Sequence, residues 1–197
     1  MKKLLPYLTT AALGLVVIAI YLYPGGSSLD QNQSGYSLLH NYWCDLLDAT
    51  AYNGQINNGR YFAMAAGILA CIALYLVMAE LGHFYGANAL QKSMAKVAAA
   101  LSMVAASLLF SPWHNFFVAL LISNLLIYFW LMVVPVWRHT QVAGRLITLI
   151  TFISLAMTAF IYYTQWSLNS LPWVQKISFL LLLVLLYHLH RRIPASQ

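Results

Sequence analysis

Long apolar stretches, each about as long as a bilayer is thick, are the feature that most constrains the fold of this chain. A transmembrane helix needs about 20 mostly apolar residues, and the sequence offers six stretches of this kind. Their predicted bounds are Leu4–Tyr23, Tyr61–Leu81, Lys92–Phe110, Trp113–Val136, Val142–Tyr163 and Pro172–His188. Only 7% of the residues are charged, whereas a soluble domain carries roughly 25%. The sequence therefore predicts a single all-α domain, residues 1–197, forming a polytopic membrane bundle of six transmembrane helices.

Lys and Arg residues gather on one side of this predicted topology. With the N-terminus in the cytoplasm, only Arg60 and Lys176 fall outside, together with the three aspartates. Cytoplasmic loops carry an excess of Lys and Arg. We therefore predict an integral protein of the bacterial cytoplasmic (inner) membrane with both termini cytoplasmic. The same bias explains the formal net charge of +6, so no nucleic-acid partner is expected.

The first loop, residues 24–60, is the longest polar segment of the chain. On a helical wheel, Tyr36–Asp48 separates into an apolar face and a polar face. The polar face consists of Ser37, His40, Asn41, Cys44, Asp45 and Asp48. We predict a short amphipathic extracytoplasmic helix here, between the first and second transmembrane helices, with Ser34 as its N-cap. Its polar face could point to water or inward to the bundle, and the sequence leaves both alternatives open.

Three cationic side chains are predicted at the starts of helices that begin on the outer side: Arg60, His114 and Lys176. A cation in this position opposes the helix dipole. Asp45 and Asp48 could supply the compensating negative charge. A bound phosphate or carboxylate could also do so, because helix N-termini favour anions. The alternative is unspecific contact with lipid headgroups or water.

These residues suggest a site. Asp45 is a candidate catalytic acid/base or electrostatic centre, with His114 and Lys176 holding a phosphate or ester oxyanion. The candidate binding residues are Arg60, Asn41, His40, Asp48 and Trp113.

The same segment holds residues for two other chemistries. Cys44 follows His40 by one helical turn, the spacing of a Cys–His nucleophile pair, but an inert small residue is the alternative. A metal could use His40, Asp45 or Asp48, and His114. The sequence lacks a paired His-x-x-x-His or His-Glu-x-x-His motif, and we predict neither a metal site nor a cofactor.

Inside the predicted helices, Glu80 is expected to pair with His83, one turn away on the second helix. Pro135 is expected to kink or end the fourth helix. Alanines make the third helix slim, which predicts close packing near the centre of the bundle.

The first loop, YPGGSSLDQNQSGYSLLHNYWCDLLDATAYNGQINN, resembles that of an uncharacterised prokaryotic six-helix membrane family. The resemblance lies in Tyr-Pro-Gly-Gly at 23–26, Asp30, Gly-Tyr-Ser at 35–37, the run 41–46 and Asn-Gly-x-x-Asn at 53–57. Cys44 stands where that family has Ser, which argues against an essential thiol. The family is distantly similar to the DRAM and Sfk types of eukaryotic six-helix membrane proteins, and through PGAP-type members to lipid-anchor remodelling. The resemblance implies a fold and a topology, and it implies no particular activity.

Three functions follow as hypotheses. The first is a protein with an extracytoplasmic-facing polar pocket that acts on or binds a lipid or lipid-linked substrate. The second is a non-catalytic sensor, scaffold or accessory subunit, with a second copy or another membrane protein as partner. A transporter ranks third, because ionisable residues at the bilayer midplane are the usual mark of an ion path and the helix centres hold almost none.

Overall fold

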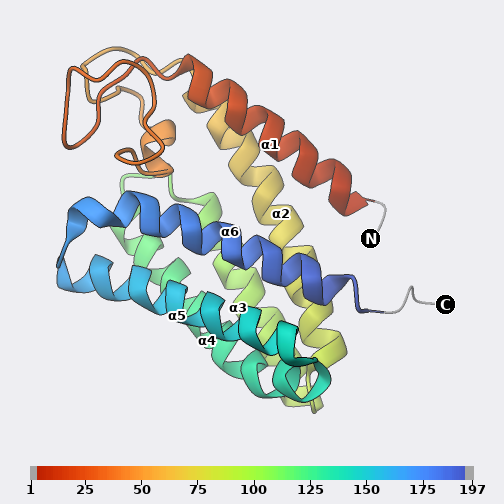
Figure 1. Cartoon of the computed structure of the whole chain (residues 1–197). Helices are drawn as coiled ribbons and strands as arrows, with labels where there is room; N and C mark the ends of the chain where they lie inside the picture. Colours follow the sequence, from red (N-terminus) through yellow and green to blue (C-terminus); the bar gives the residue numbers. More distant parts are fainter. Residues whose placement is uncertain (1–3, 194–197) are drawn as a thin grey trace.

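Six α-helices form the body of the computed structural model, which describes residues 4–193 (Figure 1). They are α1 Leu4–Leu22, α2 Arg60–Tyr85, α3 Ala89–Ser107, α4 His114–His139, α5 Val142–Thr164 and α6 Leu171–His190. Two short 3-10 helices, η1 Cys44–Leu47 and η2 Leu168–Ser170, lie in the connections. The all-helical bundle is confirmed, and each helix begins and ends within about one turn of its predicted bounds.

Within residues 4–193, five helices are long and apolar enough to cross a membrane: α1, α2, α4, α5 and the segment Leu168–His190 that contains α6. The exception is α3, whose first turns carry Gln91, Lys92 and Lys96. The described part of the chain thus has the composition of an integral membrane protein.

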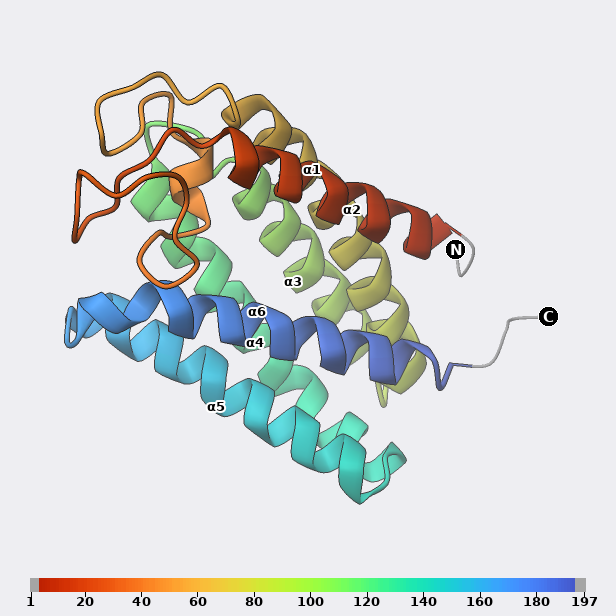
Figure 2. The same cartoon turned by 45° about the horizontal axis from the view of Figure 1, so that its top comes forward.

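Consecutive helices run antiparallel and pack in chain order, and α6 returns to contact α2 (Figures 1 and 2). One end of the bundle carries the long loop 23–59 and the connections 108–113 and 165–170; we call it the loop end. The other end carries the connections 86–88 and 140–141, and we call it the tight-turn end. Arg60, His114 and Lys176 all lie at the loop end, as the helix order requires.

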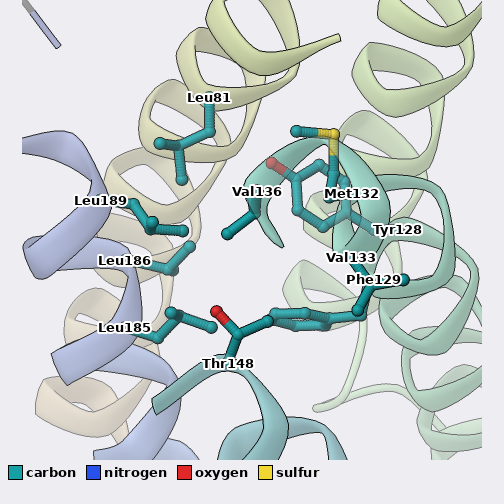
Figure 3. A pocket seen from close by; sticks show the side chains of 10 residues that line it. All are labelled: Leu81, Tyr128, Phe129, Met132, Val133, Val136, Thr148, Leu185, Leu186 and Leu189. Carbon is teal, nitrogen blue, oxygen red and sulfur yellow. The ribbon is translucent and has the colours of Figure 1, made fainter. Parts of the chain in front are cut away.

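The core lies where α2, α4 and α6 meet. Tyr128 of α4 is 2% exposed, and its hydroxyl donates a 2.8 Å hydrogen bond to the carbonyl oxygen of Met78 on α2. Figure 3 shows the small cavity beside it, lined mainly by apolar side chains that include Leu81, Leu185 and Leu189. Its volume of about 10 Å³ is at the lower limit for holding one water molecule, so this region is packed core.

Pro135 does not end α4, which continues to His139. A proline inside a helix leaves the carbonyl four residues earlier without its N–H partner. That carbonyl belongs to Leu131, and it accepts a 2.5 Å hydrogen bond from Nε2 of Gln91 on α3. Side-chain replacement of this kind is what allows proline within membrane helices.

Close packing of α3 is seen where it meets α2. A Cβ atom added at Gly82 would lie 2.8 Å from the Cβ of Ala95, too close for two carbon atoms. The small residues at these positions let the two backbones approach each other.

The predicted Glu80–His83 pair is wrong. Glu80 Oε2 instead lies 3.2 Å from Nδ1 of His190 at the end of α6, and His83 is exposed. Sequence spacing identified a partner on the same helix, whereas the fold brings a distant helix closer.

The predicted amphipathic helix over Tyr36–Asp48 is also wrong, and Ser34 is not a helix N-cap. Only the 3-10 helix η1 forms in this range, and the rest consists of turns, a bend and irregular backbone. The cause is competition from polar side chains. Ser37 Oγ accepts from the backbone N–H groups of Leu39 and His40, and Asp45 Oδ2 accepts from that of Tyr42. These groups bond within the loop and do not form a continuous solvent-facing helical stripe.

Candidate functional site

Asn41 is the centre of the long loop, and it is fully buried at 0% exposure. Its Nδ2 group donates 2.9 Å hydrogen bonds to Asp45 Oδ2 and to the carbonyl oxygen of Gly26. Its Oδ1 atom accepts from the backbone N–H of Ser37 at 2.9 Å. A buried amide with all these partners fixes three parts of the loop relative to one another.

Asn57 has a comparable role where the loop returns to α2. This fully buried side chain donates to the carbonyl oxygens of Leu46 and Asp48, at 3.1 and 3.0 Å, and accepts from the N–H of Gly59 at 3.0 Å. A Cβ at Gly59 would lie 2.6 Å from the carbonyl oxygen of Ala19. Glycine here lets the start of α2 lie directly against the end of α1.

The loop rests on α1 and α2 through an apolar cluster of Ala19, Tyr23, Leu46, Ala51 and Ala63. Its far side reaches the beginning of α6, as Figure 2 shows. The loop therefore bridges the α1–α2 pair and the α5–α6 pair at this end of the bundle.

Lys176 makes the contact with α6. Its ammonium group donates to the carbonyl oxygen of Asn41 in the loop, and to that of Pro172 in its own helix at 3.1 Å. It also lies 5.5 Å from the ring centres of both Tyr36 and Trp43, which are themselves stacked at 6.4 Å. Such cation–π contacts are each worth about 0.5–2 kcal/mol. Lys176 thus fastens the loop to α6.

Asp45 is buried, with 3% of its surface exposed. Desolvation raises its pKa to about 6, although its hydrogen bonds from Asn41 and Tyr42 and the charge of Lys176 act in the opposite direction. Oδ2 accepts both of those hydrogen bonds at 2.9 Å. Asp45 is therefore a structural acceptor that could exchange a proton near neutral pH.

A second group contains Asp48, Arg60 and His114. Partial desolvation raises the pKa of Asp48, and the positive charges of His114 and Arg60 lower it. The Nδ1 atom of His114 lies 2.6 Å from the carbonyl oxygen of Leu109. Because a carbonyl only accepts, Nδ1 carries the hydrogen, and Nε2 has no partner among the residues described.

Arg60 stands out in this group. Its Nε atom is buried and has no hydrogen-bond partner within residues 4–193. A guanidinium N–H buried without an acceptor is costly, on the order of 1–3 kcal/mol or more for a charged group. The described residues therefore supply no acceptor for this N–H.

The sequence-predicted site residues thus fall into two sets at one end of the bundle. Asp45, Asn41 and Lys176 form one, and Asp48, Arg60 and His114 form the other. Asp45, His114 and Lys176 do not hydrogen-bond one another in the described chain, so their joint catalytic role stays a prediction. His40 is half-buried and Trp113 is 72% exposed; neither side chain has a hydrogen-bond partner in that part of the chain.

The structure also bears on the thiol hypothesis and on the metal hypothesis. Burial raises the pKa of Cys44 to about 12, which leaves the thiol protonated and a poor nucleophile. Because the predicted helix does not form, the four-residue spacing of His40 and Cys44 no longer places their side chains one helical turn apart. A search of the described residues finds no group of three or more His, Cys, Asp or Glu side chains placed to hold a metal ion.

Comparisons with known proteins give no match to any family model, curated protein or solved structure. The resemblance of the first loop to the six-helix membrane family therefore stays a prediction.

Sequence reasoning missed the aromatic pair Tyr36–Trp43, and it singled out Asn57 only as part of the loop motif. A signal was present for the pair, since aromatic residues on the apolar face of a predicted surface helix can equally contact a cation. Nothing in the sequence indicates the structural role of Asn57, because that role depends on burial.

Proposed function

We propose that this chain is a six-span membrane protein whose loop end binds the anionic headgroup of a lipid or lipid-linked substrate. The observation that carries the proposal is the buried, unpartnered Nε of Arg60, in the group where the charges of Arg60 and His114 act on Asp48. A phosphate group would supply the acceptor that this N–H lacks, and helix N-termini such as those of α2 and α4 favour it further.

The sixth span in this proposal is α3. The end of α2 lies at the tight-turn end and the start of α4 lies at the loop end. If α2 and α4 both cross the membrane, the helix between them has to cross it too. At about 1.5 Å per residue, the 19 residues of α3 cover roughly the thickness of the hydrocarbon core.

The distribution of charge supports an extracytoplasmic position for the loop end. It holds Arg60 and Lys176, whereas Lys92, Lys96, Arg138 and Arg145 lie at the tight-turn end. Under the positive-inside rule the tight-turn end faces the cytoplasm, in keeping with a bacterial inner-membrane protein that has both termini inside. The headgroup would then come from the outer leaflet.

Binding is favoured over catalysis by the partners of Asp45 and Lys176. Both are held by hydrogen bonds within the protein, so neither is free to contact a substrate in this conformation. An enzyme is the second candidate, and the pKa of about 6 at Asp45 favours it, because a general acid or base works best with a pKa near the operating pH.

The test measures binding of a short-chain anionic phospholipid, dihexanoyl phosphatidylglycerol, to the purified full chain in detergent. Arg60→Gln and His114→Gln are each expected to weaken binding about tenfold, the effect of losing one charge-assisted hydrogen bond. The matched controls Arg192→Gln and His83→Gln alter exposed side chains at the opposite end and should leave affinity unchanged. Equal affinity in the wild type and both loop-end variants would overturn the proposal.

The enzyme candidate has its own measurement. The chain is reconstituted with a total bacterial lipid extract, and the lipids are analysed by mass spectrometry over time. A product formed by the wild type and absent with Asp45→Asn would favour catalysis. An unchanged lipid profile with retained binding would favour a sensor, scaffold or accessory subunit.

A further inference from the structure

A surface hollow of about 300 Å³ lies on the last turns of α4, at the tight-turn end. It is lined by Val133, Val134, Trp137 and Arg138. Val133 and Trp137 are one helical turn apart, and so are Val134 and Arg138, which places all four on one face of the helix. The valines lie toward the middle of α4, and Trp137 and Arg138 lie toward its end. The hollow therefore changes from apolar to cationic along the helix axis.

Arg145 of α5 adds a second guanidinium group at the cationic end. Its Nε donates a 3.0 Å hydrogen bond to the carbonyl oxygen of Trp137, and its central carbon lies 5.5 Å from the centre of the Trp137 ring. This bond satisfies a carbonyl in the last turn of α4. The terminal nitrogens of Arg145, like those of Arg138, have no hydrogen-bond partner in the described part of the chain.

Acidic side chains do not compensate these arginines. The described cations of this end are Lys92, Lys96, Arg138, Arg145, Arg191 and Arg192. Glu80 is the one carboxylate at this end among residues 4–193, and it lies against His190. The charge of the hollow is therefore complementary to an anion from outside the chain.

We propose that this hollow binds an anionic phospholipid, with the phosphate between Arg138 and Arg145 and an acyl chain along Val133 and Val134. This orientation of the lipid matches that in a bilayer, since its headgroup lies at the end of α4 and its acyl chain points toward the middle of the transmembrane span. Trp137 is 43% exposed and lies where interfacial tryptophans are enriched. A free phosphate would leave the apolar wall uncovered. This site lies at the opposite end of the bundle from the loop-end site and in the opposite leaflet.

The test counts bound lipids by native mass spectrometry of the full chain in detergent, with dioleoyl phosphatidylglycerol as the probe and dioleoyl phosphatidylcholine as the comparison. In the Arg60→Gln background, which removes the loop-end site, the double variant Arg138→Gln/Arg145→Gln is expected to bind phosphatidylglycerol about tenfold more weakly. The matched control Lys92→Gln/Lys96→Gln loses the same charge at the same end, outside the hollow, and should retain wild-type affinity. An equal loss in both pairs, or equal wild-type affinity for the two lipids, would overturn the proposal.

Two further variants distinguish loss of the proposed site from a local folding defect and from loss of the loop-end site. Val134→Trp fills the hollow without a change of charge, and it should lower phosphatidylglycerol occupancy severalfold even if loss of Arg145 disturbs the turn between α4 and α5. Unchanged occupancy in Val134→Trp would contradict the proposed site. Arg60→Gln should retain the lipid at this hollow, so failure of one site and failure of the other can be told apart.

Discussion

The ammonium group of Lys176 donates a hydrogen bond to the main-chain oxygen of Asn41, 135 residues earlier in the chain. The loop that contains Asn41 is packed on α1 and α2 through its apolar cluster. One side chain of α6 therefore connects the two sides of the bundle at the end where the candidate site lies.

Lys176→Met is expected to release the loop from α6. The variant loses one charged hydrogen bond to the loop and two cation–π contacts with loop rings, together worth about 2–4 kcal/mol of loop docking. Limited proteolysis between Ser28 and Asn32, an exposed part of the loop, should become at least tenfold faster. Lys96→Met changes an exposed lysine and serves as the control. A cleavage rate equal to that of the wild type would show that the contact does not hold the loop.

The helices could be predicted from sequence because membrane-length apolar runs are a local signal. The loop could not be predicted in the same way. Its hydrogen bonds depend on which polar side chains become buried, and the periodicity of Tyr36–Asp48 gives no sign that Asn41 and Asp45 bond to the loop itself. The partner of Glu80 was missed for a related reason, since His190 is distant in sequence and close only in the fold.

The candidate site was predicted in part. Helix order alone places Arg60, His114 and Lys176 at one end. The sequence did not separate them into two sets, because that depends on Lys176 bonding to Asn41 rather than to a ligand. The unpartnered Nε of Arg60 is a property of packing.

Gln91→Leu is expected to destabilise the bundle by about 1–2 kcal/mol, because the Leu131 carbonyl loses its donor and the Ala87 N–H loses its acceptor. Pro135→Ala supplies a backbone N–H for that carbonyl, so Gln91→Leu should cost much less in the Pro135→Ala background. Unfolding of the wild type, the two single variants and the double variant in detergent gives the coupling free energy between Gln91 and Pro135. Strictly additive effects would contradict the proposed compensation.

Acidification is expected to stabilise the loop through Asp45. Its pKa is about 6 in the folded chain against an ordinary 3.8, so the folded form binds the proton more tightly than the unfolded form. Raising the pH from about 4 to 6 therefore lowers the free energy of unfolding, by up to about 3 kcal/mol. The raised pKa of Asp48 acts with the same sign.

The pH dependence is checked by thermal unfolding between pH 4 and 7. Asp45→Asn should remove most of this slope, whereas Asp30→Asn, at an exposed position, should retain it. A slope that persists unchanged in Asp45→Asn would assign the effect to other groups.

Solid-state NMR measures directly whether Arg60 holds a lipid phosphate. Protein labelled with ¹⁵N at arginine Nε is reconstituted into phosphatidylglycerol bilayers, and dipolar dephasing of each ¹⁵N signal by ³¹P is recorded. Arg60→Lys removes one signal and so identifies it. We expect the Arg60 Nε signal to be dephased by phosphorus at hydrogen-bonding range. An Arg60 signal that shows no ³¹P dephasing would contradict the proposed headgroup site.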